Sequence, residues 1–335
     1  MTITRRQWLA GAAGLAAAGG SALLPAGCGK ESGPAPFTLA MMPKSLGNQY
    51  FISCRAGAER AAKELGIKLL WDAPAKPDAS RQNEFVEAWI TRGVDAIAVA
   101  CENGEGIAES LRKARAKGIK VLTWDADSVA DARDFFVNQA TPERIGTALM
   151  DEAARVLGGK GEFAIITATL TASNLNKWRV AIEKRLAEKY PDVKLAVTRP
   201  CDDQAEKARA EAKTIMSAHP NVKLILAICS PSVPAAAEAV KQSGRADVKV
   251  VGLGLPNDNK PYLKEGFTDT VILWKTEDLG ALTVHAAYAA AKGLLKAGDK
   301  KFEVKGMGSF EIQGSDIILG DPFKFTKDNV DQFNF

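Results

Sequence analysis

The feature that most constrains the fold is a pattern of short apolar strands alternating with amphipathic helices. The first copy of the pattern begins with an apolar strand at 37–42 and a helix over 50–65, whose apolar residues recur at helical spacing. Further strands are expected at 68–71, 96–100 and 121–124. Strands that are apolar throughout and alternate with helices predict a parallel sheet covered by helices on both faces.

The pattern then starts again near residue 163. A strand at 163–166 is followed by a helix over 175–190, and the strand at 222–228 resembles the segment 94–100 in position and composition. This duplication at domain scale predicts an α/β fold of two similar doubly wound parallel-sheet lobes. Ligands bind beyond the carboxyl ends of the strands in such sheets, so the cleft between the lobes is the expected site.

The carboxyl-terminal segment indicates that the chain crosses between the lobes more than once. A strand at 270–274 precedes an Ala-rich helix over 279–295, and short strands follow near Phe310 and Ile317. We expect a multi-crossing hinge between a first lobe of residues 37–138 plus 275–311 and a second lobe of residues 139–274 plus 312–335.

The first 28 residues read as an export signal rather than as part of the fold. Arg5 and Arg6 precede an apolar run over 9–24, which is typical of a twin-arginine signal and short for a membrane span. Cys28 closes a segment similar to a bacterial lipobox, which predicts lipidation, although an ordinary signal peptide with a chance cysteine is the alternative. Residues 29–36 read as a flexible tether.

Composition excludes several classes of function. The net charge is +4, with basic and acidic residues interspersed, so nucleic acid is not an expected partner. The chain has two histidines, His219 and His285, far apart in sequence, which argues against a histidine-based catalytic triad or multi-histidine metal site. The remaining cysteines lack metal-ligand spacing and are interpreted as buried free thiols, namely Cys54, Cys101, Cys201 and Cys229.

Several motifs at predicted strand ends resemble one protein family. They are Met-Pro-Lys-Ser-Leu-Gly-Asn-Gln-Tyr-Phe at 42–51, Leu-Thr-Trp-Asp-Ala-Asp at 122–127, the segment 168–178, and Val-Gly-Leu-Gly-Leu-Pro at 251–256. Their order and content resemble the periplasmic sugar-binding proteins of ribose-receptor type, and within these the rhamnose and autoinducer receptors of ABC importers. The resemblance extends from Phe37 nearly to Phe335.

The resemblance implies a periplasmic binding protein fold and a non-catalytic function. The chain would be the extracytoplasmic substrate-binding component of an ABC sugar importer. Its partners would be a small sugar, the permease subunits of the importer and a lipid anchor, and the chain would act as a monomer without cofactor or metal.

The resemblance also implies a set of ligand-binding residues. Asp125, at the end of a strand, would accept hydrogen bonds from two ligand hydroxyls. The complete set is Lys44, Asn48, Tyr50, Phe51, Asp125, Asp127, Asn138, Gln139, Asn174, Trp178, Ser230, Leu255, Pro256, Asn257 and Trp274.

Structural alternatives remain open for several members of this set. Lys44 could be a solvated loop lysine, and Asp127 a turn residue. Trp274 could be a hinge-packing aromatic. Asn48 could serve as a helix cap and Phe51 as core, while Asn138 and Gln139 could only fix the hinge.

Two departures from the autoinducer receptors favour a rhamnose-like deoxyhexose over a furanosyl signal. The chain has Asn174 and Leu175 where those receptors carry an acid and an amide, and it has Ile228, Cys229 and Ser230 where they carry a proline-containing turn.

Three other classes of function fit the sequence less well or add nothing to sugar binding. A secreted sugar-modifying enzyme is disfavoured because the glycine motif at 251–254 lacks the third glycine of a dinucleotide loop, and because Asp125 and Asp127 make a weak catalytic pair. A gene regulator on the same two-lobe scaffold would need a DNA-binding helix pair at the amino end, where this chain has the expected export signal. A chemosensory role is compatible with sugar binding.

Overall fold

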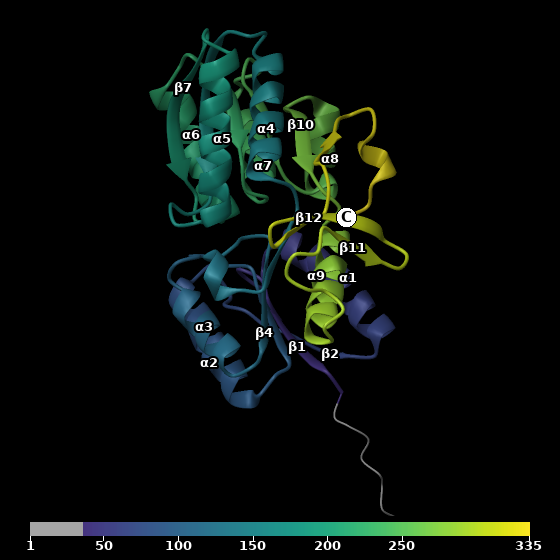
Figure 1. Cartoon of the computed structure of the whole chain (residues 1–335). Coiled ribbons are helices and arrows are strands. Elements are labelled where there is room, and N and C mark those ends of the chain that lie inside the picture. The colour runs from purple at the N-terminus through teal and green to yellow at the C-terminus, as the bar shows by residue number, and fades with distance from the viewer. Residues whose placement is uncertain (1–35) are drawn as a thin grey trace, which may run out of the picture. The chain divides into compact units, whose positions relative to one another are not determined.

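A computed structural model describes residues 36–335, which form one compact unit containing two separate β-sheets. The expected export signal, Cys28 and most of the tether lie outside the described residues. Figure 1 shows that β1, β2 and β4 belong to one lobe, and that β7 and β10 belong to the other.

The sheet of the first lobe is built on five parallel strands in the order β2-β1-β3-β4-β5. Their bounds are β1 Thr38–Met42, β2 Lys68–Trp71, β3 Ala96–Val99, β4 Lys120–Trp124 and β5 Phe135–Asn138. The central strands β1, β3 and β4 are almost wholly buried, as expected for a sheet that is covered on both faces.

Three late strands extend this sheet beyond β5. The strand β13 (Asp316–Ile318) pairs in parallel with β5, and β12 (Gly308–Gln313) and β11 (Lys301–Val304) follow as antiparallel neighbours. The expected start of the second lobe at residue 312 is therefore wrong for residues 312–318. A strand as short as β13 carries no local sequence signal for the sheet that it joins, because its pairing partner β5 is far away in the sequence.

Helices cover both faces of the first sheet. On one face α1 (Gln49–Leu65) packs against α9 (Thr276–Ala291), and on the other α2 (Ala79–Arg92) packs against α3 (Ala108–Ala116). Figure 1 shows the two pairs on opposite sides of β4. Helix α9 ends four residues before the predicted end at Leu295, and the chain reverses at Gly293 with a φ of 69°.

Two glycines allow α1 and α9 to approach closely. A Cβ atom on Gly57 would lie 1.8 Å from the carbonyl oxygen of Glu277, and one on Gly280 would lie 1.9 Å from the carbonyl oxygen of Cys54. This reciprocal contact joins the amino-terminal helix of the lobe to a helix more than 200 residues later in the sequence.

The second sheet has five parallel strands and one antiparallel edge strand, in the order β14-β10-β9-β8-β6-β7. Their bounds are β6 Gly161–Thr167, β7 Val193–Pro200, β8 Val222–Ala227, β9 Lys249–Leu253, β10 Thr268–Leu273 and β14 Phe323–Phe325.

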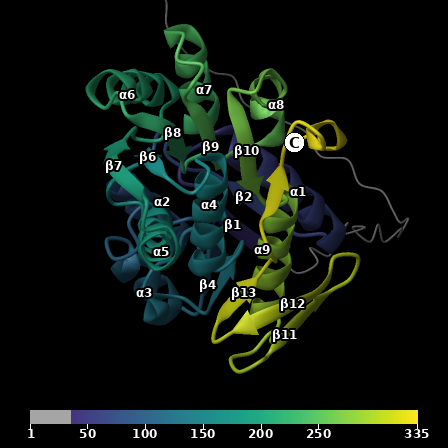
Figure 2. The same cartoon turned by 90° about the horizontal axis from the view of Figure 1, so that it is seen from above.

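Helices flank this sheet, as Figure 2 shows from above. Helices α4 (Pro142–Val156) and α5 (Ser173–Lys189) pack together, α6 (Ala205–Ala218) packs on α7 (Ser232–Ser243), and α7 also contacts α8 (Pro256–Glu265). None of the helices in residues 36–335 combines the length and apolar character needed to cross a bilayer.

Helices α4 and α8 were not predicted from the sequence. For α4 the signals are nevertheless present, because the Thr141 side chain caps the helix by accepting a hydrogen bond from the Arg144 amide, and Pro142 occupies the first turn. The predicted fold class of two doubly wound lobes is confirmed.

Candidate ligand-binding site

A cavity lies between the two lobes, where a two-lobe protein of this class would hold a small ligand. The first lobe contributes Lys44, Asn48, Tyr50, Phe51, Glu102 and Asp125 to its lining. The remaining lining residues are Ala168, Asn174, Leu175, Trp178, Asp203, Ile228, Cys229, Ser230, Leu253, Leu273 and Trp274. Most of them lie at or just beyond the carboxyl ends of parallel strands, where α/β sheets bind ligands.

Asp125 stands directly after β4 in a left-handed backbone conformation, with a φ of 61°. Aspartate tolerates this region better than most residues, although it remains uncommon. The turn is held because the Asp125 amide donates to the Val137 carbonyl at 3.2 Å, and the Gln139 side-chain amide donates to the Asp125 carbonyl at 3.1 Å. The carboxylate lines the cavity as a result.

A chain of hydrogen bonds orients this carboxylate. The Trp274 indole donates to the Tyr50 hydroxyl at 2.9 Å, and Tyr50 donates to Asp125 Oδ1 at 2.7 Å. Asn174 from the second lobe approaches Asp125 Oδ2 at 3.5 Å. A carboxylate has about four acceptor positions, so Asp125 keeps capacity for ligand hydroxyls.

Burial dominates the electrostatics around Asp125. It raises the pKa of this carboxyl from 3.8 to about 6, although the Lys44 ammonium and the Tyr50 hydrogen bond both oppose the shift. Burial and the nearby Asp125 charge raise the pKa of Tyr50 well above its ordinary value. Tyr50 therefore remains a neutral hydrogen-bond donor at physiological pH.

Lys44 supplies the positive charge of the cavity and bridges the two lobes. Its ammonium donates to Asn174 Oδ1 at 2.9 Å and lies 3.9 Å from Glu102 Oε2. Glu102 is in turn hydrogen-bonded by the Thr169 hydroxyl of the second lobe. Lys44 is 6% exposed, so the interpretation of a solvated loop lysine is wrong.

Asn48 makes a second contact between the lobes while capping α1. Its Oδ1 accepts from the Tyr50 amide at 2.9 Å, as an N-cap does, and from the Ser230 hydroxyl at 3.1 Å. Its Nδ2 donates to Asp203 Oδ2 at 2.7 Å. Oδ1 therefore serves both the cap and the contact with Ser230, whereas Nδ2 serves only the contact with Asp203.

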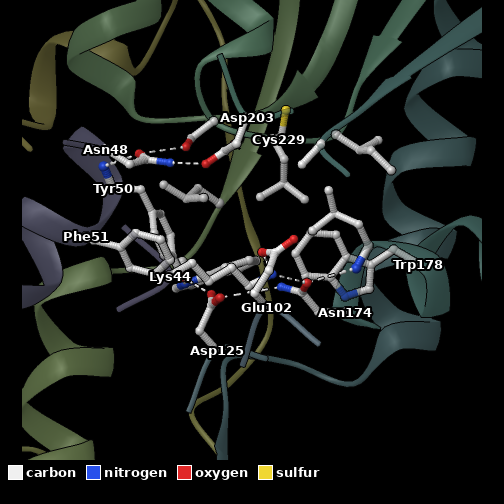
Figure 3. A pocket seen from close by; sticks show the side chains of 17 residues that line it. Lys44, Asn48, Tyr50, Phe51, Glu102, Asp125, Asn174, Trp178, Asp203 and Cys229 are labelled. Carbon is white, nitrogen blue, oxygen red and sulfur yellow. Dashed lines mark hydrogen bonds and ion pairs between the residues drawn. The ribbon is translucent and has the colours of Figure 1, made fainter. Parts of the chain in front are cut away.

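Aromatic and aliphatic side chains form the rest of the wall. Figure 3 shows Tyr50 and Phe51 on one side of the cavity and Trp178 on the other. Trp178 contacts Trp274 edge to face, with ring centroids 6.1 Å apart. The strand ends of the second lobe add Ile228, Leu253 and Leu273 to this wall. Such a site offers charged and amide groups to hydroxyls and apolar faces to carbon.

Nine of the fifteen residues predicted from the sequence line this cavity, and six do not. Those in the lining are Lys44, Asn48, Tyr50, Phe51, Asp125, Asn174, Trp178, Ser230 and Trp274. Those outside it are Asp127, Asn138, Gln139, Leu255, Pro256 and Asn257.

Asp127 is engaged in a buried ion pair instead of facing the cavity. Arg133 donates to both of its oxygens at 2.8 Å, and the Thr123 hydroxyl also donates to it. Arg133 continues to Asp316 of β13 at 2.7 Å. The ligand contact expected of Asp127 is replaced by a structural function, since the ion pair ties the loop after β4 to the added strand.

Asn138 and Gln139 lie at a crossing between the lobes. The Asn138 carbonyl accepts from the Leu319 amide at 2.8 Å, and the Gln139 carbonyl accepts from the Gly320 amide at 3.3 Å. Gln139 affects the cavity only through its bond to the Asp125 carbonyl. Their positions support the hinge alternative rather than direct ligand contact.

The predicted contacts at 255–257 are placed too far along the chain. β9 reaches Leu253, which lines the cavity, and the chain then turns into α8 at Pro256. The Asn257 amide instead donates to the carbonyl of Phe335 at 3.2 Å, which docks the carboxyl terminus.

Sequence reasoning missed two acidic lining residues, Glu102 and Asp203. Glu102 follows the strand predicted at 96–100, so the strand-end rule could have found it, whereas Asp203 stands in the loop beyond the end of β7 at Pro200. Asp203 has a φ of 54°, and burial raises the pKa of its carboxyl. Among residues 36–335 no group of three or more histidine, cysteine or acidic side chains is arranged to hold a metal ion.

Comparisons with known proteins place this geometry in a family. The family model described as a periplasmic binding protein domain matches residues 39–295. An ABC transporter solute-binding protein from Clostridium phytofermentas, solved with L-rhamnose, is 31% identical, with a TM-score of 0.86 over 89% of this chain and 98% of that one. LsrB from Clostridium saccharobutylicum, solved with AI-2, is 27% identical, with a TM-score of 0.85 over 89% of this chain and all (100%) of that one.

A curated relative extends the range of ligands. The xylitol-binding protein of Mycolicibacterium smegmatis is 29% identical over 280 residues, or 83% of this chain and 74% of the relative. The chain belongs to the periplasmic binding protein family, whose members act outside the cytoplasm. The resemblance to ribose-receptor-type proteins is confirmed, and these relatives are binding proteins of transport systems rather than enzymes.

Proposed function

We propose that the chain is the substrate-binding component of an ABC importer and captures a rhamnose-like deoxyhexose in the interlobe cavity. The observation that carries the proposal is that the cavity lining has a polar part and a separate apolar part. Lys44, Asp125 and Asn174 form one hydrogen-bonding group, and Ile228, Leu253 and Leu273 form an apolar wall at the strand ends of the second lobe.

A deoxyhexose matches both parts of this lining. Its ring hydroxyls can donate to Asp125 and accept from Lys44, and its methyl group can lie against the aliphatic wall. A hydroxyl in place of the methyl would lose its water without gaining a partner there, which is costly. The L-rhamnose bound by the 31% identical solute-binding protein supports this choice.

The alternative ligand is a furanosyl autoinducer. It is supported by the 27% identical LsrB, which was solved with AI-2. The first departure from the autoinducer receptors is at Asn174 and Leu175. Both residues line the cavity, so this departure is at positions that would touch a ligand. The same holds for Ile228, Cys229 and Ser230, and these substitutions favour the deoxyhexose.

A sugar-modifying enzyme is the less favoured alternative. The carboxylate pair weighed for it does not converge, because Asp127 is held by Arg133 outside the cavity. We propose further that residues 37–138 plus 275–318 and residues 139–274 plus 319–335 are the two lobes that close on the sugar. Export by the twin-arginine route, lipidation at Cys28 and a monomeric state belong to the same proposal.

Calorimetric titration with L-rhamnose and L-mannose tests the ligand assignment. The two sugars differ only at carbon 6, where L-mannose carries a hydroxyl and L-rhamnose a hydrogen. We expect L-rhamnose to bind at least about tenfold more tightly, which corresponds to about 1.4 kcal/mol. Native mass spectrometry of the incubated complex should recover unchanged sugar. Equal affinities would exclude the methyl contact, and a cleaved or oxidised sugar would establish an enzyme.

A further inference from the structure

The loops after β7 and β8 bring two buried thiols together behind the cavity wall. The Sγ atoms of Cys201 and Cys229 lie 3.4 Å apart, and both residues are buried, as predicted. Their strands are not neighbours, because β6 lies between β7 and β8 in the sheet. The two cysteines therefore meet across the carboxyl end of β6.

The backbone at each cysteine is already fixed. The Cys201 amide donates to the Thr167 carbonyl at the end of β6 at 2.8 Å, and the Cys229 carbonyl accepts from the Ser232 hydroxyl at 2.6 Å. A disulfide requires the sulfur atoms to approach from 3.4 Å to about 2.05 Å.

We propose that Cys201 and Cys229 are a disulfide site that locks the two loops clasping Asn48, and that the site is oxidised through the open cleft. Asp203 follows Cys201 by two residues, Ser230 follows Cys229 directly, and both contact the Asn48 side chain across the cleft. The disulfide fixes these two contact groups relative to each other before the lobes close.

The two cysteines take different parts in the reaction. Cys229 lines the cavity and Cys201 is fully buried, so a disulfide oxidant entering the open cleft meets Cys229 first. The Cys229 thiolate attacks one sulfur of the oxidant and releases a thiol, forming a mixed disulfide. The Cys201 thiolate then attacks Cys229 Sγ and releases the second thiol. Two protein thiols and one disulfide become one protein disulfide and two thiols.

Closure of the cleft protects the site. Burial, followed by the neighbouring Cys201 and Asp203, raises the pKa of the Cys229 thiol well above its ordinary value, so little thiolate exists in the closed form. An extracytoplasmic protein meets disulfide oxidants in its compartment, which is where such a site has a use.

Mass spectrometry of the full chain tests the proposal without any sugar. Reduced protein is incubated with bis(2-hydroxyethyl) disulfide, quenched in acid, denatured, alkylated and mapped. We expect a linked peptide pair containing Cys201 and Cys229, with Cys54 and Cys101 alkylated, and a higher thermal midpoint for the oxidised protein. Wild-type protein that never yields the linked pair overturns the proposal, whatever the variants do.

Variants separate the two cysteines. Cys201→Ser lacks the resolving thiol and should accumulate the mixed disulfide at Cys229, whereas Cys229→Ser should form neither product. Cys101→Ser is the matched control, because it removes another buried thiol and should leave the 201–229 link intact. A mixed disulfide on Cys201 in Cys229→Ser would contradict the route through the cavity.

A final arm rests on the proposed sugar site. Saturating L-rhamnose should slow oxidation of the wild type severalfold by keeping the cleft closed. If L-rhamnose binds by calorimetry but leaves the rate unchanged, access through the cleft is wrong. If L-rhamnose does not bind at all, the proposed sugar is wrong, and the disulfide is still decided by the linked peptide.

Discussion

Asp125 combines the features that a binding carboxylate needs, namely burial, fixed orientation and spare acceptor capacity. Asp125→Asn preserves the shape and the left-handed backbone, which asparagine also tolerates, but removes the charge. Hydrogen bonds to a charged group contribute about 1.5–3 kcal/mol each, so L-rhamnose binding should weaken by about 10- to 100-fold. Calorimetric titration measures the change.

Asp202→Asn is the matched control for this substitution. Asp202 also has a positive φ, 52°, but it lies outside the cavity and pairs with Lys207 at 2.6 Å. Its replacement should leave the affinity unchanged. An affinity that falls equally in both variants would show that the effect comes from the backbone conformation and not from the carboxylate.

The raised pKa of Asp125 predicts a dependence of stability on pH. The folded state holds the Asp125 proton up to about pH 6, whereas the unfolded chain releases it near 3.8. The folded state binds more protons in this window, so the contribution of Asp125 to the free energy of unfolding decreases as pH rises from about 4 to 6. The carboxylate is therefore destabilising at neutral pH when no ligand is bound.

Asp125→Asn should consequently raise the thermal midpoint of the sugar-free protein at pH 7. The gain should shrink towards pH 4, where the wild-type carboxyl is already protonated, because asparagine resembles the protonated form. Calorimetric scans between pH 4 and 8 measure the difference. A gain that is constant across this range would contradict the assigned pKa. Weaker binding with greater stability is the expected cost of a preorganised site.

At the level of single residues, the sequence predicts which residues stand at strand ends better than it predicts which of them line the cavity. Lys44 and Asp125 could be identified because each stands at a predicted strand end within a family-like motif, and Trp274 because it ends the predicted strand at 270–274. Asp127 could not be excluded, since its partner Arg133 lies in a loop whose path depends on β13, far away in the sequence. Glu102 carries no family-like motif, so only its position after a predicted strand could have identified it, whereas the folded cleft brings Asp203 into the lining.

At the scale of elements, the start of α1 couples helix formation to closure of the cleft. Asn48→Asp keeps an oxygen that can cap the Tyr50 amide but replaces the Nδ2 donor with an oxygen facing Asp203. Aspartate is about as good an N-cap as asparagine, so the helix should survive. Two acidic side chains would then face each other across the cleft and oppose closure.

We expect Asn48→Asp to leave the thermal midpoint of the sugar-free protein nearly unchanged and to weaken L-rhamnose binding by about tenfold or more. The variant should recover part of this affinity as the pH is lowered and the two carboxyls share a proton. Asn48→Ser, which keeps a cap without the charge, should bind better than the aspartate variant. The reverse order would show that Asn48 acts only as a cap.

Which elements form could largely be predicted, but the sheet that the late elements join could not. Apolar periodicity identified most of the parallel strands of both sheets, although not β5, because burial on two faces leaves a continuous apolar run. The strands β11–β14 are short and partly exposed, and their pairing depends on register with β5 and β10, which local sequence does not encode.

At the scale of the whole molecule, the chain segments that cross between the lobes are hydrogen-bonded to residues that line the cavity. The chain passes between the two sheets at 139–141, 274–275 and 319–322. The first and third crossings are hydrogen-bonded to each other through Gln139 and Gly320, and the Gln139 side chain also holds the Asp125 carbonyl. Trp274 lies at the second crossing and donates to Tyr50. A rotation at these crossings would therefore move the ligand-facing groups directly.

The direct bonds between the lobes predict how closure responds to ligand. Lys44 with Asn174, Asn48 with Asp203 and Ser230, and Glu102 with Thr169 all join the lobes without a ligand. Opening the cleft breaks these contacts, but it returns water to Asp125 and the other buried acids, which favours the open form at neutral pH. A bound sugar replaces that water with hydrogen bonds and shifts the population towards the closed form.

Solution scattering on the wild type at pH 7 should therefore give a smaller radius of gyration with saturating L-rhamnose than without it. Asn48→Asp at the same sugar concentration should stay close to the larger value, because the introduced carboxylate and Asp203 repel each other across the cleft. Lowering the pH to about 5 without sugar should shift the wild type part of the way towards the smaller value, since protonation of Asp125 removes the main cost of closing. A wild-type profile that does not change with bound sugar would exclude a closing motion as the means of capture.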